Sequence, residues 1–400
     1  MKKILFIHHN TISVGAGLSA LHIIASISQE RYNVVVCMPA GAGDLGDKLE
    51  KMGVKVRKEF HHSCTYTHVN GYHYNLLSIS HLHNVYELLK SREVVQRVIQ
   101  EEHPDIVMVN SMTLFWIGHL AQKAGAKTIC FHRESYCHGM LGMRTNYIKY
   151  RLNRDFDKIV FLSEYDMKQT GNNYGKYIKI TDKVDIKLYD KLDKAVIRKE
   201  LQLPETDKLI LFAGGMSKLK GIDIILKALN AMQTDAKLVL LQYNGPTLLA
   251  SGIKGWRQKF RRWRNKDTEY WAEQYIKEHN LENRVILRGQ TDEVQKYFVA
   301  CDMVVFPSQE AHQARPIFEA GIAGRPIAVS DFENTREYLD AENGWCVKYD
   351  DVNAWAAVCD KVLQGGECVD RKIELNYNRA IKNNNIDDQK RDINNLMSML

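Results

Sequence analysis

Short apolar runs alternate with longer amphipathic stretches along this chain of 400 residues, and the alternation occurs twice. In the first half we expect strands at residues 4–7, 33–38, 54–56, 106–109, 127–131 and 158–162. In the second half we expect them at residues 209–212, 237–241, 285–287, 303–306, 327–329 and 344–347. Strands that alternate with helices form right-handed βαβ units and parallel sheets. The sequence therefore predicts an α/β protein with two Rossmann-like, doubly wound domains.

The alternation is interrupted near residues 174–207, which are rich in lysine and aspartate. We therefore expect four parts: a first domain at 1–180, a linker at 181–207, a second domain at 208–368, and a helical tail at 369–400 that packs across both domains. Doubly wound sheets bind ligands beyond the carboxyl ends of their strands. The two domains are expected to face each other across a cleft that holds the site.

The chain has a formal net charge of +7, which suits an anionic partner, and 8 cysteines without a C-x-x-C pair. The cysteine spacing disfavours a disulfide framework and a cysteine zinc site, and it indicates a reducing compartment. His8 and His9 interrupt the first apolar run, which we interpret as a strand and not as a signal peptide. No run has the length of a membrane-spanning helix. We expect a cytoplasmic protein, soluble or peripheral on a membrane.

Basic and aromatic residues are concentrated together at residues 144–158 and 254–266. Such runs are typical of solvated helix faces and also of helices that contact anionic membranes. Both interpretations stay open, and the functional one is peripheral attachment at the inner face of the plasma membrane. We expect no nucleic-acid partner.

Gly15 and Gly17 match the G-x-G-x-x-A form of a dinucleotide fingerprint. NAD binding is disfavoured, because the first glycine lies well beyond the strand end and the second strand ends without a carboxylate for a ribose. These glycines are expected either to bring backbone amides near a sugar or phosphate or only to form the turn.

In the second domain, Gly214 and Gly215 follow the first strand and Lys220 comes at the start of a helix. Glycines followed by a lysine can hold a diphosphate, with the ammonium as a point charge on the leaving phosphate. The spacing is not that of a P-loop, so ATP hydrolysis is disfavoured. From the spacing alone, an ordinary surface lysine explains Lys220 almost as well as a diphosphate-binding lysine does.

The segment 307–330 leaves a strand, passes a polar loop and opens a helix at Arg315 and Pro316, with Glu319 one turn inside. The free amides and the positive dipole end of a helix N-terminus attract phosphate. A carboxylate on the same turn can accept two hydrogen bonds from a ribose diol. This segment outlines a nucleotide-sugar site.

His132 ends an apolar strand at the carboxyl edge of the first sheet. A histidine there can donate to a sugar hydroxyl or shuttle a proton, and it can also be structural. The histidines show no H-E-x-x-H pattern, and we expect no metal ligation.

Taken together, these motifs resemble those of the retaining "glycosyl transferases group 1" family, which has the GT-B fold. ILFAGGMSKLKGID resembles the family's phosphate loop F-x-G-R-L-x-x-x-K-G, and VILRGQTDEVQKYFVACDMVVFPS resembles the segment that stacks on the base and leads to the acidic motif. PDIVMVNS, KTICFHRES and IVFLSEYDMKQ resemble strands of the family's first domain.

The resemblance implies a metal-independent glycosyltransferase without a cofactor, which moves a sugar from a UDP- or GDP-linked donor to a glycan or polyprenyl-linked acceptor in capsule or lipopolysaccharide synthesis. His132 would contact the transferred sugar, Lys220 the departing phosphate and Glu319 the ribose, while Arg288 and Gln290 would lie near the base. Two alternatives stay open: a protein that binds nucleotide sugar or glycan without transfer, and a GT-B epimerase.

The sequence departs from the family pattern at two places. Gly215 stands where the phosphate loop usually has arginine, and Arg315 is the candidate substitute. At the first of the family's paired glutamates the chain has Ala311, one place from Glu310. Either Glu310 reaches the sugar, or the backbone amides between Ala311 and Ala314 take this role.

Overall fold

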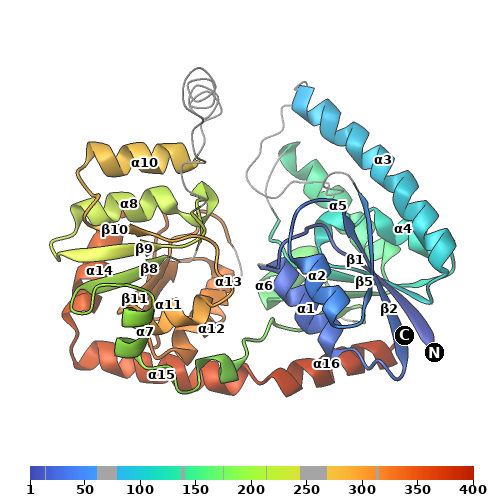
Figure 1. Ribbon diagram of the computed structural model, residues 1–400. Helices are drawn as coiled ribbons and strands as arrows, with labels where there is room; N and C mark the ends of the chain where they lie inside the picture. Colours follow the sequence, from blue (N-terminus) through green and yellow to red (C-terminus); the bar gives the residue numbers. More distant parts are fainter. Residues whose placement is uncertain are drawn as a thin grey trace. The chain divides into compact units, whose positions relative to one another are not determined.

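The chain forms two compact units in a computed structural model (Figure 1). Unit 1 comprises Met1–Asp182 and Ile386–Leu400, and unit 2 comprises Lys183–Asn385. The structure describes residues 1–13, 15–60, 79–136, 140–173, 175–212, 214–243, 268–311 and 315–400.

Unit 1 contains, within the described ranges, a parallel seven-stranded sheet in the order β3-β2-β1-β4-β5-β6-β7. Its strands are β1 (Lys2–Ile7), β2 (Tyr32–Pro39), β3 (Lys55–Phe60), β4 (Ile106–Val109), β5 (Lys127–His132), β6 (Lys158–Phe161) and β7 (Tyr177–Lys179). Its helices are α1 (Ala16–Ser26), α2 (Leu45–Lys51), α3 (Ile79–Glu102), η1 (Met112–Leu114), α4 (Ile117–Lys123), η2 (Met140–Gly142), α5 (Met143–Asp155), α6 (Glu164–Thr170) and α16 (Ile386–Ser398).

Both faces of this sheet are buried, as the unbroken apolar strands require. Leu5 and Ile7 of β1 pack into the cluster under α3, α4 and α5, whereas Ile4 and Phe6 pack into the cluster under α1, α2 and α16. Successive side chains of a strand point to opposite faces. The sheet is therefore doubly wound, as predicted.

Unit 2 repeats the scheme, over the residues described, with a parallel six-stranded sheet in the order β10-β9-β8-β11-β12-β13. Its strands are β8 (Lys208–Phe212), β9 (Ala236–Leu240), β10 (Val285–Leu287), β11 (Met303–Phe306), β12 (Ile327–Ser330) and β13 (Trp345–Val347). Its helices are η3 (Ile186–Tyr189), α7 (Lys194–Glu200), η4 (Lys218–Lys220), α8 (Ile222–Ala231), α10 (Thr268–Glu278), α11 (Val294–Ala300), α12 (Arg315–Ile322), α13 (Glu333–Arg336), α14 (Val352–Gln364) and α15 (Glu367–Asn383).

Figure 1 shows α8, α10 and α14 on one side of this sheet and α7, α11 and α12 on the other. The alternation along β8 agrees, because Ile210 and Phe212 join the first cluster while Leu209 and Leu211 join the second. The predicted α/β class with two doubly wound sheets is confirmed.

The stretch 174–207, in which the alternation is interrupted, is more ordered than its composition suggested. It contains β7 at the end of the predicted first domain and α7 in the predicted linker, and neither element was expected. Helix α7 packs against α11 within unit 2. In the tail, α15 packs on α12 of unit 2 and α16 packs on α1 of unit 1.

No helix in the described part of the chain is both long enough and apolar enough to cross a bilayer.

Candidate functional site

The loop that follows β8 in unit 2 is tightly packed around its glycines. A side chain at Gly214 would have no room, since its Cβ would lie 2.5 Å from Cζ of Phe212 and 2.8 Å from Cβ of Lys220. Gly215 has a φ of 67°, in the region that favours glycine. Gly214 thus lets Lys220 lie close to the ring of Phe212, the last residue of β8.

The same loop is joined to the segment that leaves the neighbouring strand β11. The backbone N–H of Gln309 donates to the carbonyl of Leu219 over 2.9 Å, and Oγ of Ser308 donates to the same carbonyl over 3.3 Å. Gly221, with φ at 86°, lies so close that a Cβ would collide with the carbonyl oxygen of Pro307. The phosphate-loop motif and the beginning of the acidic motif therefore form one structure.

The Lys220 side chain is only half-buried, but its ammonium is enclosed. Nζ lies 5.3 Å from the centre of the Phe306 ring. Burial lowers the pKa of Lys220 from its usual value to about 7. No carboxylate among the described residues forms an ion pair that offsets this burial. A bound anion would supply the missing charge, because an opposite charge nearby favours the protonated form.

Glu319 and Arg315 interact on the first turns of α12. Nε of Arg315 donates to Oε1 of Glu319 over 3.0 Å, and Glu319 is 7% exposed. Arg315 was the predicted substitute for the family's phosphate-loop arginine, and its guanidinium donates to Glu319 in the structure. A phosphate contact of Arg315 stays a prediction. Pro316 follows in the first turn of α12, where a backbone N–H would have no acceptor within the helix, so its absence costs no hydrogen bond.

Tyr189 of η3 is a neighbour of this pair that the sequence analysis missed. Burial, and then the Glu319 carboxylate, raise the pKa of Tyr189 well above its usual value, while Arg315 acts in the opposite direction. A tyrosine in a stretch expected to be a linker offered no sequence signal for this contact.

The loop before α12 is described only in part. The Glu310 carbonyl accepts a hydrogen bond from Oγ of Ser308 over 2.8 Å. Ala314 lies outside the described residues, as do 312 and 313. The choice between Glu310 and the backbone amides as the sugar contact stays a prediction.

Arg288, predicted to lie near the nucleotide base, uses its guanidinium at the end of α7. Nη2 donates to the carbonyls of Leu201 over 3.4 Å and Gln202 over 3.1 Å. Gly289 and Gln290, which follow β10, are exposed. The base contact predicted for Arg288 and Gln290 stays a prediction.

In unit 1, His132 ends β5 as expected, but its ring is enclosed. The residue is 1% exposed, and its ring lies 4.9 Å from that of Tyr136 and 4.8 Å from that of Phe161. This packing agrees with the structural interpretation that the sequence left open, and the sugar contact stays a prediction.

Gly17 is explained by local packing, since a Cβ there would collide with the Ile12 carbonyl. Gly15 differs, because it caps α1 with a φ of 56° and has open space around the position of a Cβ. Close packing therefore accounts for Gly17, and the positive φ of Gly15 fits the turn interpretation. A contact of either glycine with a sugar or phosphate stays a prediction.

Arg133, beside His132, is the central polar residue of this region and was not singled out from the sequence. Its Nη1 donates to Oδ2 of Asp182 over 2.7 Å and to Oγ of Ser19 over 2.8 Å, and its Nε donates to Oδ1 of Asn110. The sequence signal for this network was a charged residue directly after an apolar strand. A charged group that is buried needs hydrogen-bond or ion-pair partners.

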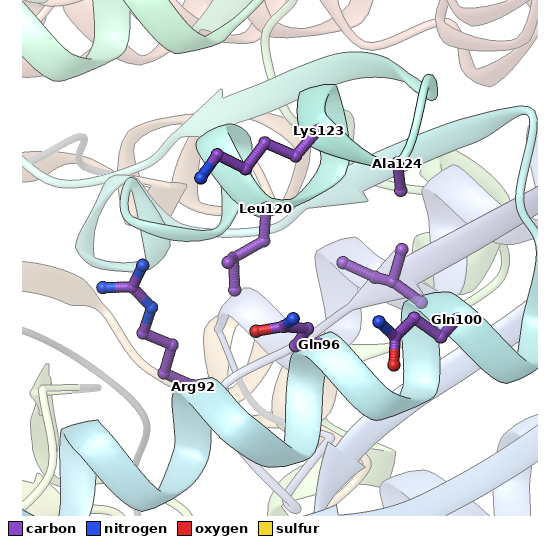
Figure 2. A pocket seen from close by; sticks show the side chains of 7 residues that line it. Arg92, Gln96, Gln100, Leu120, Lys123 and Ala124 are labelled. Carbon is purple, nitrogen blue, oxygen red and sulfur yellow. The ribbon is translucent and has the colours of Figure 1, made fainter.

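A pocket of about 250 Å³ lies elsewhere in unit 1, between α3 and α4. Figure 2 shows Arg92 and Gln96 of α3 near Lys123 of α4. The two helices lead into the amino ends of β4 and β5, whereas doubly wound sheets bind ligands at the carboxyl ends. This pocket contains none of the predicted site residues.

Two family models match the chain: "Glycosyl transferases group 1" over residues 193–384 and "Glycosyltransferase Family 4" over residues 14–181. The chain belongs to the group 1 glycosyltransferases. The first match contains Lys220 and Glu319, and the second contains His132.

Sequence relatives of this glycosyltransferase are distant. A D-inositol 3-phosphate glycosyltransferase of Xylanimonas cellulosilytica is 28% identical over 177 residues, which are 44% of this chain and 38% of that protein. A protein of the same description from Stackebrandtia nassauensis is 26% identical over 188 residues, or 45% of this chain and 39% of that protein. The matched region is thus under two-fifths of each relative.

Solved structures give the fold. Anabaena HepE in complex with UDP and glucose has a TM-score of 0.79 and 18% identity, with all of both chains covered. WaaG, a glycosyltransferase involved in lipopolysaccharide biosynthesis, has a TM-score of 0.68 and 14% identity, with 98% of each chain covered. The glycosyltransferase therefore has the GT-B fold that its motifs indicated.

Among the residues that the structure describes, no three His, Cys, Asp or Glu side chains gather where they could hold a metal ion.

Proposed function

We propose that this protein transfers a sugar from a UDP- or GDP-linked donor to a glycan or lipid-linked glycan in surface polysaccharide biosynthesis, with retention of configuration and without a metal ion. The proposal rests first on Lys220. Its ammonium is enclosed near the end of β8, its pKa is lowered to about 7, and its loop is bonded to the segment that leads to Glu319. That arrangement suits a diphosphate next to a ribose.

The donor would bind on unit 2. Its diphosphate would lie against Gly214, Gly215 and Lys220, and its ribose would lie on Glu319, whose carboxylate Arg315 already orients. Gln290 would lie near the base. The HepE structure that contains UDP and glucose supports a UDP-linked donor by analogy of fold.

The protein's contribution to the reaction would be electrostatic. As the bond between sugar and phosphate breaks, negative charge grows on the departing phosphate, and Lys220 would stabilise it. The same phosphate would take the proton of the acceptor hydroxyl on the face it leaves, so that configuration is retained without a nucleophilic carboxylate. His132 would hold the sugar.

Release of nucleoside diphosphate on addition of acceptor tests this function. We expect UDP or GDP to appear only when a matching nucleotide sugar and a glycan, lipid-linked or phosphorylated-polyol acceptor are both present. The phosphorylated polyol is included because the curated relatives are named for such an acceptor. Conversion of the nucleotide sugar without acceptor would instead identify an epimerase, and binding without turnover would identify a binding protein.

We also propose that unit 1 attaches to anionic membranes through α5. Leu141 before it is fully exposed, and Met143, Tyr147 and Tyr150 are between 48% and 60% exposed. Arg154 lies 5.2 Å from the Tyr150 ring, so charge and aromatic surface are presented together. The second basic segment, 254–266, lies outside the described residues.

Replacing Leu141, Met143 and Tyr150 together by serine is expected to lower partitioning onto acidic vesicles by at least about 10-fold, because each lost apolar side chain removes about 1.5–3 kcal/mol of possible burial. Cosedimentation with phosphatidylglycerol vesicles measures this. Tyr377→Ser, at a 43% exposed tyrosine on α15, is the matched control. Unchanged partitioning of the triple variant would exclude α5 as the anchor.

A further inference from the structure

Gln242 has an unusual backbone conformation for its place in the fold. Six non-glycine residues in the described ranges have positive φ: His103, Leu141, Lys191, Gln202, Gln242 and Asn280. Five of them lie in or within two residues of a helix or 3-10 turn, where a left-handed residue commonly ends or joins helices. Gln242, with φ at 60°, instead follows the strand β9.

The position of Gln242 is at the carboxyl edge of the unit 2 sheet. Leu240 of β9 pairs with Phe212 of β8, so Gln242 lies level with the glycine loop that follows β8. Its side chain lies against Gly215, since a Cβ at that glycine would be 2.6 Å from Oε1 and 3.5 Å from Cβ of Gln242. The backbone is held there by a 3.3 Å bond from its N–H to the Gly289 carbonyl.

A glycine would adopt this backbone conformation without strain. We therefore look for an interaction of the glutamine side chain that offsets the free energy of the strain. Strained residues persist where the surrounding structure holds them, and they are concentrated at ligand sites. A carboxamide has two N–H donors and one acceptor. The carboxamide of Gln242 occupies the space into which a side chain at position 215 would point. Because residue 215 is glycine, the carboxamide can lie beside the loop that carries Lys220.

We propose that Gln242 is a donor-binding residue whose carboxamide N–H groups hydrogen-bond the diphosphate of the nucleotide sugar above Gly215. This inference rests on the proposed function. It assigns to a neutral amide the contact that a charged side chain at position 215 would otherwise make. The diphosphate would then be bound by residues that follow β9 as well as by residues that follow β8.

Isothermal titration calorimetry of Gln242→Gly with UDP, GDP, UMP and GMP tests the proposal. We expect affinity for the diphosphate that wild type binds to fall by about 10-fold or more, as for a lost hydrogen bond to a charged group, and monophosphate affinity to stay within about twofold. The melting temperature should stay level or rise by a degree or two, because glycine relieves the left-handed strain.

Gln202→Gly is the matched control. It is the same substitution, at an exposed residue with φ at 51° in the same unit, and it should leave both affinities unchanged. Unchanged diphosphate affinity in Gln242→Gly, an equal loss for the monophosphate, or a melting temperature lowered by several degrees would each overturn the inference. If wild type itself binds neither diphosphate, the proposed function fails, and this inference fails with it.

Discussion

Lys220→Ala should lower turnover of the nucleotide-sugar donor by about 100- to 1000-fold, the usual effect of removing one preorganised group that stabilises charge in the transition state. The reason is that the substitution removes the enclosed ammonium that would stabilise the negative charge on the departing phosphate. Steady-state release of nucleoside diphosphate measures the change. The effect should fall on both the donor KM and kcat, because the ammonium contacts the bound diphosphate and the charge on that diphosphate grows as the bond breaks.

Lys218→Ala is the control for this experiment. Lys218 belongs to the same 3-10 turn but is exposed, and its Nζ lies 5.4 Å from the Trp271 ring. We expect its turnover to stay within about twofold of wild type, as for surface substitutions generally. Near-native turnover of Lys220→Ala would refute the assignment of the diphosphate to this loop.

The pH dependence of donor affinity gives a second readout of Lys220. Its pKa is about 7 in the free protein, and a bound diphosphate would raise it, so binding takes up a proton above pH 7. Affinity for an intact nucleotide sugar should be flat below pH 7 and then weaken by up to about 10-fold per pH unit. Lys220→Arg should abolish this slope, because arginine stays protonated. A flat wild-type profile up to pH 8.5 would contradict the proposed site.

Arg133→Met should lower the free energy of unfolding by about 3–5 kcal/mol, the range for breaking a buried ion pair on one side. The side chains of Arg133 and Asp182 are 5% and 15% exposed, so the substitution removes a buried cation 2.7 Å from a largely buried carboxylate. It also removes the hydrogen bonds that Arg133 donates to Oγ of Ser19 in α1 and to Oδ1 of Asn110 after β4. Urea unfolding followed by tryptophan fluorescence and circular dichroism measures the loss.

Lys127→Met is the control, at the start of β5, the strand that Arg133 follows. Its side chain is 56% exposed and lies 4.0 Å from Asp157, an ion pair of the kind that contributes little. We expect a change within about 1 kcal/mol. If Arg133→Met were as mild as this control, the network around Arg133 would have no special part in holding unit 1 together.

The strands of both sheets were predictable because their signal is local. Each is a short apolar run between polar turns, and a strand buried on both faces needs nothing more to be recognised. Strand β7, Tyr177–Lys179, was missed because it is short and lies among polar residues. Helix α7 was missed in the same stretch, although Asp193 caps it through its side chain.

Only the contiguous motifs of the candidate site could be predicted from the sequence. The glycines before Lys220 and the helix opening before Glu319 are contiguous patterns, and their spacing indicated a phosphate and a ribose. The spacing said nothing of where each side chain would turn. Arg288 donates to the carbonyl of Gln202 beyond the end of α7, and Arg315 donates to Glu319.

From the amino acids alone came the class of fold, the order of its strands along the chain and the family, since periodicity, glycine positions and short motifs are properties of neighbouring residues. The tertiary structure decided the partners of buried polar groups. Arg133 with Asp182, the Lys220 loop with Gln309, and Gln242 with Gly215 are separated by many residues, and burial leaves each group only the partners that folding brings near. Long-range pairing of this kind has no local pattern, because it depends on which strand ends meet at one edge of a sheet.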